Sequence, residues 1–209
     1  MLHTFSLACH PMFYDPQRLP WTSNLRQNWR TIQEEMHSLD RGRFVPWALD
    51  KLYQGKWQQF VLFAPGYEFK ENQALAPKTT SLVREIPGVT LATFARLTSG
   101  THVHPHIGYT HVVLRAHLGL KVPDGECWLR VGEETRKWQE GEFLVFDDMV
   151  EHEVTNQSNT DRIVLMLDFL RPFKLRTSFL GHFRQRLVLK RQLPLPWKQL
   201  EDFHQREIL

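Results

Sequence analysis

Short β-rich segments follow one another through the second half of the chain, and their spacing constrains the fold more than any other feature. The expected strands cover residues 89–97, 112–120, 127–131, 135–138, 143–146, 152–155 and 162–169. Gly, Asp, Asn and Pro turn residues separate them at intervals of roughly ten residues. This spacing predicts an all-β sandwich, barrel or jelly roll rather than a sheet built from alternating strands and helices.

The segments on either side of this β-rich region have helical periodicity. An apolar residue recurs every three or four positions between Leu25 and Leu39, which predicts one helix beginning near Asn24. A shorter helix is expected over residues 78–85, and helical periodicity returns after Phe173. We therefore expect one domain over residues 1–209, with a helical region over about 1–88, a β core over about 89–172 and a helical tail over about 173–209.

The composition excludes several classes of protein. No apolar run approaches the ~20 residues that a membrane-spanning helix needs. The first residues are too polar for a secretory signal. Cys9 and Cys127 allow at most one disulfide, so we expect a reduced, cytoplasmic setting.

Charged residues are unevenly distributed along the chain. Residues 171–200 contain eight Lys or Arg and no acid, whereas residues 124–161 contain eleven acids and three bases. The simplest interpretation is a solvated tail whose charge balances the acidic part of the same domain. An interaction module that binds nucleic acid or an anionic surface through this tail is the alternative. No nucleic-acid partner is expected, because the tail lacks the interleaved aromatics of single-strand binders.

Strand alternation places charged side chains on inward faces of the expected barrel. Arg115 and His117 point to one side of their strand, and the apolar residues between them point to the other. Arg162 shares a face with Asp168 in the last strand. A buried charge needs a partner, which an anionic ligand inside the barrel would provide. Pairing of Arg115 and Arg162 with the acidic loops is the alternative.

His106 and His152 are the candidate metal ligands. Neutral imidazole binds Fe(II) well, and two histidines from different strands can hold one metal ion and leave other positions open. In the common non-haem iron site an Asp or Glu follows the first histidine by two residues. Gly108 occupies that place here. We expect water to fill the vacancy.

The other polar residues near these two histidines receive ordinary structural roles. We expect His102, His104 and His111 to form structural hydrogen bonds. Asp147 and Asp148 follow a strand directly, and we expect them to form a turn.

At these residues the chain resembles the aspartyl/asparaginyl β-hydroxylase family of Fe(II)- and 2-oxoglutarate-dependent dioxygenases. The similarity lies in HPHIG at 104–108, LRAHLGL at 114–120, WQEGEFLVFDD at 138–148, EHEV at 151–154, DRI at 161–163, LPW at 19–21 and NW at 28–29. It extends over about residues 13–172. The resemblance implies a mainly β fold with flanking helices, a double-stranded β-helix of the jelly-roll, cupin-like kind.

The resemblance also implies a role for each candidate residue. His106 and His152 match the metal histidines, with no catalytic residue beyond them. Arg162 matches the arginine that grips the distal carboxylate of 2-oxoglutarate, and His117 matches a second contact to this co-substrate. Arg115 matches a residue on the co-substrate and substrate side of the pocket.

Two positions depart from the general pattern of the family. Gly108 matches the animal-type branch, which lacks the acidic ligand. Ala95 stands where the animal enzymes use a polar contact to the co-substrate, which puts that contact in doubt here.

The implied activity is hydroxylation of an aliphatic carbon with Fe(II), O₂ and 2-oxoglutarate. The most specific expectation is the β-carbon of an aspartyl or asparaginyl residue or a related amino acid. A hydroxylase of a lipid or another small molecule is the alternative within the family. A non-enzymatic metal- or ligand-binding barrel, and a halogenase that admits halide at Gly108, also remain open.

Overall fold

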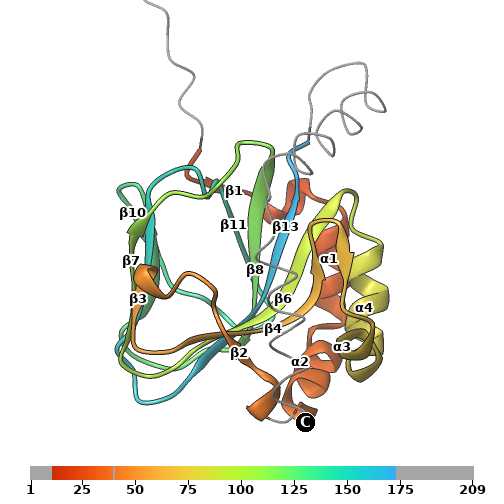
Figure 1. Ribbon diagram of the computed structural model, residues 1–209. Helices are drawn as coiled ribbons and strands as arrows, with labels where there is room; N and C mark the ends of the chain where they lie inside the picture. The colour runs from red at the N-terminus through yellow and green to blue at the C-terminus, as the bar shows by residue number, and fades with distance from the viewer. Residues whose placement is uncertain (1–10, 40, 173–209) are drawn as a thin grey trace, which may run out of the picture.

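Two antiparallel β-sheets face each other, and four helices cover the outer face of the larger sheet (Figure 1). This computed structural model describes residues 11–39 and 41–172. The larger sheet has the strand order β1-β11-β8-β13-β6-β4-β2, with β5 paired to β4. The smaller sheet has the order β10-β9-β12-β7-β3. The predicted mainly β, jelly-roll fold with flanking helices is confirmed.

The larger sheet consists of β1 (Phe13–Tyr14), β2 (Val45–Pro46), β4 (Trp57–Ala64), β5 (Tyr67–Glu68), β6 (Val89–Leu97), β8 (Val113–Lys121), β11 (Phe143–Phe146) and β13 (Arg162–Leu170). The smaller sheet consists of β3 (Tyr53–Gln54), β7 (Thr101–His106), β9 (Cys127–Val131), β10 (Glu134–Arg136) and β12 (His152–Asn156). The helices are α1 (Trp21–Gln27), α2 (Trp29–Ser38), α3 (Lys70–Leu75) and α4 (Pro77–Arg84), with 3-10 turns at Pro16–Arg18, Arg41–Arg43 and Asp50–Leu52.

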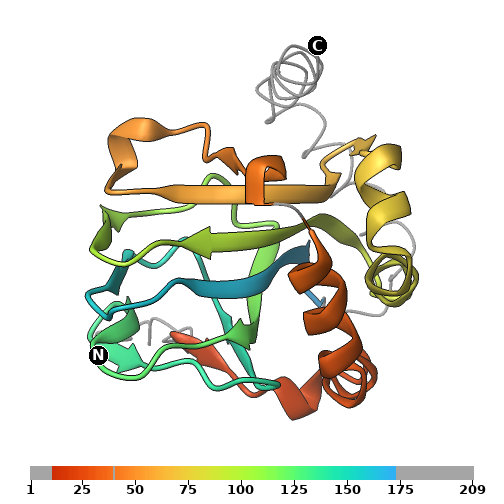
Figure 2. The same cartoon turned by 90° about the horizontal axis from the view of Figure 1, so that it is seen from below.

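The larger sheet separates two apolar cores. On its outer face, apolar side chains of β8 and β13 such as Leu118 and Leu165 pack with Ile32 of α2. On its inner face, Val164 and Met166 of β13 pack into the space between the two sheets. Each fully buried Leu or Ile stabilises the fold by about 1.5–3 kcal/mol. Figure 2 shows the helices along one side of the larger sheet. The other side of this sheet faces the smaller sheet.

Two of the sequence predictions about helices need correction. One helix was expected from near Asn24, but the structure has α1 from Trp21 and α2 from Trp29, separated at Asn28. Asn28 has φ −103° and ψ 11°, and its side-chain amide donates to the Asn24 carbonyl at 2.9 Å. A side chain that competes for a helical carbonyl favours a break at this position.

The expected helical region up to residue 88 also contains strands, above all β4. This strand lies between β6 and β2 in the larger sheet and is buried on both faces. From Phe60 to Ala64 its sequence is therefore a continuous apolar run, without the alternation that indicates a strand. In contrast, the seven strands expected after residue 88 are observed with ends shifted by at most two residues.

Some predictions fall on residues outside the described ranges. These are the helical tail from residue 173, its basic charge, and Cys9. Cys127 is a buried free thiol. In the described ranges, no helix is long and apolar enough to cross a membrane.

Candidate metal and co-substrate site

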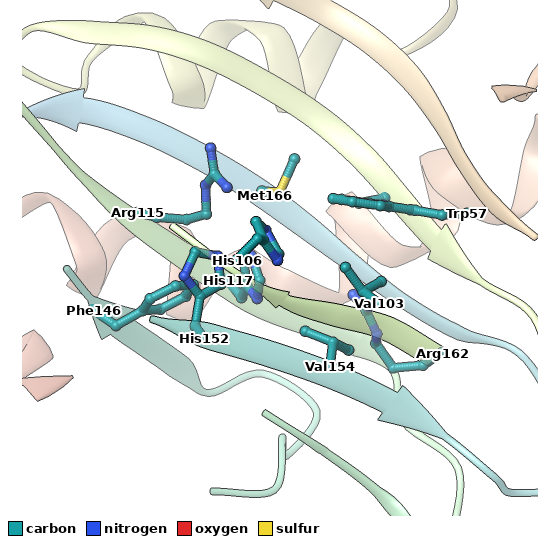
Figure 3. Close-up of a pocket in the computed structure, with 11 residues that line it drawn as sticks. Trp57, Val103, His106, Arg115, His117, Phe146, His152, Val154, Arg162 and Met166 are labelled. Carbon is teal, nitrogen blue, oxygen red and sulfur yellow. The ribbon is translucent and has the colours of Figure 1, made fainter. Parts of the chain in front are cut away.

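A pocket between the two sheets brings the five predicted site residues together (Figure 3). His106 at the end of β7 and His152 at the start of β12 come from the smaller sheet. Arg115 and His117 on β8 and Arg162 on β13 come from the larger sheet. The other lining residues are Trp57, Ala95, Val103, Phe146, Val154 and Met166.

The two histidines from the smaller sheet lie directly opposite each other. His106 and His152 are paired in register between β7 and β12, and their ring centroids are 4.2 Å apart. The Nδ1 atom of His106 is 2.7 Å from the His104 carbonyl, and that of His152 is 2.9 Å from the Val150 carbonyl. A carbonyl only accepts, so each Nδ1 carries the proton and each Nε2 keeps a free lone pair. This tautomer is the one that binds a metal ion through Nε2.

Burial keeps both rings neutral. It lowers the pKa of His106, and it lowers the pKa of His152 to about 3, with the neighbouring His106 ring adding to the effect. Phe146 packs its ring against that of His152 at 5.5 Å between centroids. Neutral imidazoles that are held in place by carbonyls and an aromatic neighbour are suited to metal binding.

Arg162 is a buried cation without an anionic partner among the described residues. Its Nε and Nη1 atoms have no hydrogen-bond partner, and its guanidinium lies 4.6 Å from the centroid of the Trp138 ring. Burial lowers the pKa of Arg162 to about 10. Leaving one charge buried and unpaired costs several kcal/mol. The guanidinium therefore indicates a binding site for an anion.

His117 is likewise buried without a hydrogen-bond partner on either ring nitrogen. Burial lowers its pKa well below the usual value, and the charges of Arg162 and Arg115 lower it further. Its ring stacks on Trp138, with 6.1 Å between centroids. His117 thus offers one N–H donor and one acceptor to a ligand in the same pocket.

Buried polar side-chain atoms that lack a partner are concentrated around this pocket. Within residues 11–39 and 41–172 they belong to Trp57, Gln59, His117, Trp138, Asp148 and Arg162. Such atoms are rare in folded proteins and need an explanation. Three of these residues line the pocket. A polar ligand bound between the sheets is therefore the simplest explanation of their unpartnered atoms.

Arg115 differs from Arg162 because its charge is already paired. Its Nε and Nη2 atoms donate to the two oxygens of Asp168 at 2.7 and 2.8 Å, and Asp148 lies 3.4 Å away. Burial lowers the pKa of Arg115, but the carboxylates of Asp168 and Asp148 more than offset this and raise it. Pairing with carboxylates, left open by the sequence, is thus observed for Arg115. Its contact with a co-substrate or substrate stays a prediction.

Asp148 has a role beyond the turn that the sequence predicted. Asp147 does form a turn, because its carboxylate accepts from the Met149 amide at 3.2 Å. Asp148 is fully buried, and neither of its oxygens has a hydrogen-bond partner. A Cβ placed on Gly108 would lie 2.5 Å from Cγ of Asp148. The space that a side chain at position 108 would need is therefore occupied by the carboxylate of Asp148.

The buried carboxylate of Asp148 is expected to cost stability at neutral pH. Burial raises the pKa of Asp148 to about 6. The folded state then binds more protons than the unfolded state between about pH 4 and 6, so this contribution to stability is lost as the pH rises through that window. We expect Asp148→Asn to raise the free energy of unfolding of the metal-free protein at pH 7.5 by about 1–3 kcal/mol. Denaturant titrations at pH 7.5 and pH 4.5 check this, and the gain should shrink at the lower pH.

Asp168→Asn is the matched control for that measurement. It removes the carboxylate that pairs with Arg115 through both oxygens, so it is expected to destabilise the protein by about 3–5 kcal/mol. Equal destabilisation by both substitutions would contradict the distinction between Asp148 and Asp168.

Comparison with known proteins places this pocket in a family. Residues 26–172 match the family described as Aspartyl/Asparaginyl beta-hydroxylase, and the chain belongs to this family. It is 34% identical over 182 residues to an ornithine lipid ester-linked acyl 2-hydroxylase of Rhizobium tropici, covering 82% of this chain and 65% of that protein. It is 35% identical over 157 residues to the aspartyl/asparaginyl beta-hydroxylase of Homo sapiens, covering 71% of this chain and 21% of that protein.

The chain thus spans less than two thirds of the length of either relative. Among solved structures, a prolyl-4-hydroxylase of Pseudomonas putida aligns with a TM-score of 0.48 and 19% sequence identity. That alignment covers 71% of this chain and 88% of the other.

Proposed function

We propose that this protein is an Fe(II)- and 2-oxoglutarate-dependent hydroxylase of an aliphatic carbon. One observation carries the proposal: two neutral histidines with free Nε2 atoms share a pocket with an unpaired, buried arginine. The histidines suit a divalent metal, and the arginine suits a carboxylate. Membership of a hydroxylase family supports the same activity.

The residues present fit both groups. His106 and His152 would hold the metal, and Arg162 with His117 would hold the dicarboxylate, so their unpartnered nitrogens would be satisfied. When bound, Fe(II) and 2-oxoglutarate would supply the oxidising chemistry. The chain's own contribution is to orient the bound groups and to exclude water with apolar walls such as Phe146 and Met166.

Asp148 would supply the negative charge that the common non-haem iron site places two residues after its first histidine, at position 108 here. Its carboxylate fills the space beside Gly108 and lacks a hydrogen-bond partner. The Asp148 carboxylate can accept a hydrogen bond from a group, such as water, that takes the place of a third protein ligand to the metal. A carboxylate in this space also disfavours a halide there by charge repulsion, which weakens the halogenase alternative.

Two substrate classes are candidates for the proposed hydroxylase activity. The first is the β-carbon of an aspartyl or asparaginyl residue or of a related amino acid, as the name of the human relative suggests. The second is an aliphatic chain of a lipid, as the name of the Rhizobium relative suggests.

The charge of the pocket favours the second candidate. Arg115 and Arg162 are the two cations that line the described pocket. Asp168 pairs with Arg115, and a carboxylate of the proposed co-substrate would pair with Arg162. No cation of the described pocket would then be free to bind an acidic side chain. Ile107 and Tyr109, which follow His106, are 60% and 41% exposed and extend the apolar character beyond the pocket.

Product analysis with both substrate classes tests the proposal. The purified protein is incubated with Fe(II), 2-oxoglutarate and O₂, together with either Asp- and Asn-containing peptides or ornithine lipids. We expect succinate in a 1:1 ratio to a product that is one oxygen atom heavier than its substrate. We expect this product from the ornithine lipids and not from the peptides. Absence of succinate with every substrate would favour a non-enzymatic barrel. A chlorinated product in the presence of chloride would instead identify a halogenase.

A further inference from the structure

Trp138 is a buried tryptophan beside two pocket residues that lack hydrogen-bond partners. The Arg162 guanidinium lies over its ring, with 4.6 Å from Cζ to the ring centroid. The His117 ring lies on it at an interplanar angle of 25°, with 6.1 Å between centroids. Trp138 is only 3% exposed and is not among the residues that line the described pocket. One indole ring thus contacts both of the side chains that would bind the co-substrate.

The segment that carries Trp138 packs closely on Gly119 of β8. Trp138 lies between β10 and β11. The Gly119 N–H group donates to the Glu142 carbonyl at 3.1 Å, and the Gly119 carbonyl accepts from the Gly141 N–H group at 2.9 Å. A Cβ on Gly119 would lie 2.9 Å from the Gln139 carbonyl carbon and closer still to its oxygen. The missing side chain therefore allows the backbone next to Trp138 to approach the strand.

The choice of tryptophan at this position is not explained by packing alone. Nε1 of Trp138 is buried and has no hydrogen-bond partner among the described residues. A buried donor without an acceptor destabilises the fold, and a Phe or Leu side chain would avoid this cost. What the indole offers in return is its ring face, which attracts a cation more strongly than the ring of Tyr or Phe does.

Arg162 is the cation that uses this ring face. Its Nε and Nη1 atoms have no partner within residues 11–39 and 41–172, so the indole is a main source of attraction for its charge. The attraction between a guanidinium and an aromatic face is strongest where water is excluded, as it is here. It would hold the guanidinium in one orientation before any ligand arrives. A group that is already oriented loses less freedom on binding and therefore binds more tightly.

We infer that Trp138 is a positioning residue, which orients Arg162 for the distal carboxylate of the co-substrate. This inference rests on the proposed function. Trp138 acts through Arg162 and, by stacking, through His117. Its loss should therefore weaken the binding of 2-oxo acids that carry a second carboxylate more than the binding of those that do not.

Binding of two 2-oxo acids tests the inference. Isothermal titration calorimetry of the Mn(II)-loaded protein, without oxygen, compares 2-oxoglutarate with 2-oxopentanoate, which has the same carbon chain but no distal carboxylate. Trp138→Leu keeps an apolar side chain and removes the ring face. We expect it to weaken 2-oxoglutarate binding about tenfold and to change 2-oxopentanoate binding by less than threefold. Trp138→Phe keeps a weaker ring face, so we expect it to weaken 2-oxoglutarate binding only about threefold.

Trp21→Leu is the matched control. Trp21 packs edge-on against Phe143 and Phe169, with 5.5 and 5.0 Å between ring centroids, in the core on the other face of the larger sheet. Its loss removes a comparable amount of aromatic packing but should preserve the preference for 2-oxoglutarate. If Trp138→Leu does not fold, Trp138→Phe and this control decide the question.

A spectroscopic measurement on the metal-free protein tests the positioning itself. Protons over an aromatic face are shielded, so the side-chain resonances of Arg162 should lie upfield in the wild-type protein and in Trp21→Leu. They should move downfield in Trp138→Leu and, to a smaller extent, in Trp138→Phe. Unchanged Arg162 resonances, unchanged 2-oxoglutarate binding, or equal weakening of both 2-oxo acids would overturn the inference and leave the proposed function standing. Failure of the wild-type protein to bind 2-oxoglutarate with metal would overturn both.

Discussion

His152→Ala and His106→Ala are each expected to abolish tight metal binding and to lower succinate formation by more than a hundredfold. The magnitude follows from metal sites in general, where loss of an outer hydrogen-bond partner alone costs about 10–100-fold. These two residues are the only pair of histidines brought ring to ring in the described pocket. Mn(II) binding by calorimetry and succinate release measure the two effects.

His104→Ala is the control for these variants. The His104 side chain does not line the pocket, and only its backbone carbonyl accepts from His106. Alanine keeps that carbonyl, so metal affinity and turnover should stay within about threefold of wild type. Full turnover by the His152→Ala protein would rule out the assigned metal site.

Gly108→Asp is expected to damage the protein rather than to complete a three-ligand metal site. The backbone at Gly108 would accept a side chain, but Asp148 occupies the space that it needs. The new side chain would be overpacked, and two carboxylates would meet in a buried site. We expect a loss of about 2–5 kcal/mol in the free energy of unfolding. Denaturant titration measures the loss, and calorimetry measures the accompanying fall in Mn(II) affinity.

A second substitution should relieve this damage. In the double variant Gly108→Asp with Asp148→Ala, the obstructing carboxylate is absent and one carboxylate remains. We expect it to recover most of the lost stability and to bind Mn(II) more tightly than Gly108→Asp alone. Gly108→Ala, which adds only the Cβ, separates overpacking from charge repulsion. A stable Gly108→Asp single variant with increased metal affinity would show that Asp148 does not fill this position.

Strand periodicity made the centre of the site predictable. Arg115 and His117 alternate with apolar residues along β8, and Arg162 begins the long strand β13, so the period of two in a strand predicted their inward faces. All three residues line the pocket. The same alternation placed Asp168 on the face of Arg162, although no role was assigned to it. Its pairing with Arg115 depends on the register between β8 and β13, which one strand's pattern does not specify.

Asp148 and Trp57 could not be assigned from local pattern. Asp148 meets Gly108 only because β7 and β12 pair in the folded sheet, so residues forty positions apart become neighbours. Trp57 lies in β4, whose burial on both faces removes the alternation that reveals a strand. That its ring N–H group lacks an acceptor can be recognised only from the three-dimensional positions of the neighbouring polar atoms. The cellular location and the role of the basic tail stay predictions.

Conversion of 2-oxoglutarate to succinate by the wild-type protein tests the central claim most directly. It is measured with substrate present, once with Fe(II) and once with an excess of a metal chelator. We predict succinate in a 1:1 ratio to hydroxylated product with Fe(II), and none above background with the chelator. Hydroxylated product formed at the same rate without iron, or without consumption of 2-oxoglutarate, would contradict the proposed function.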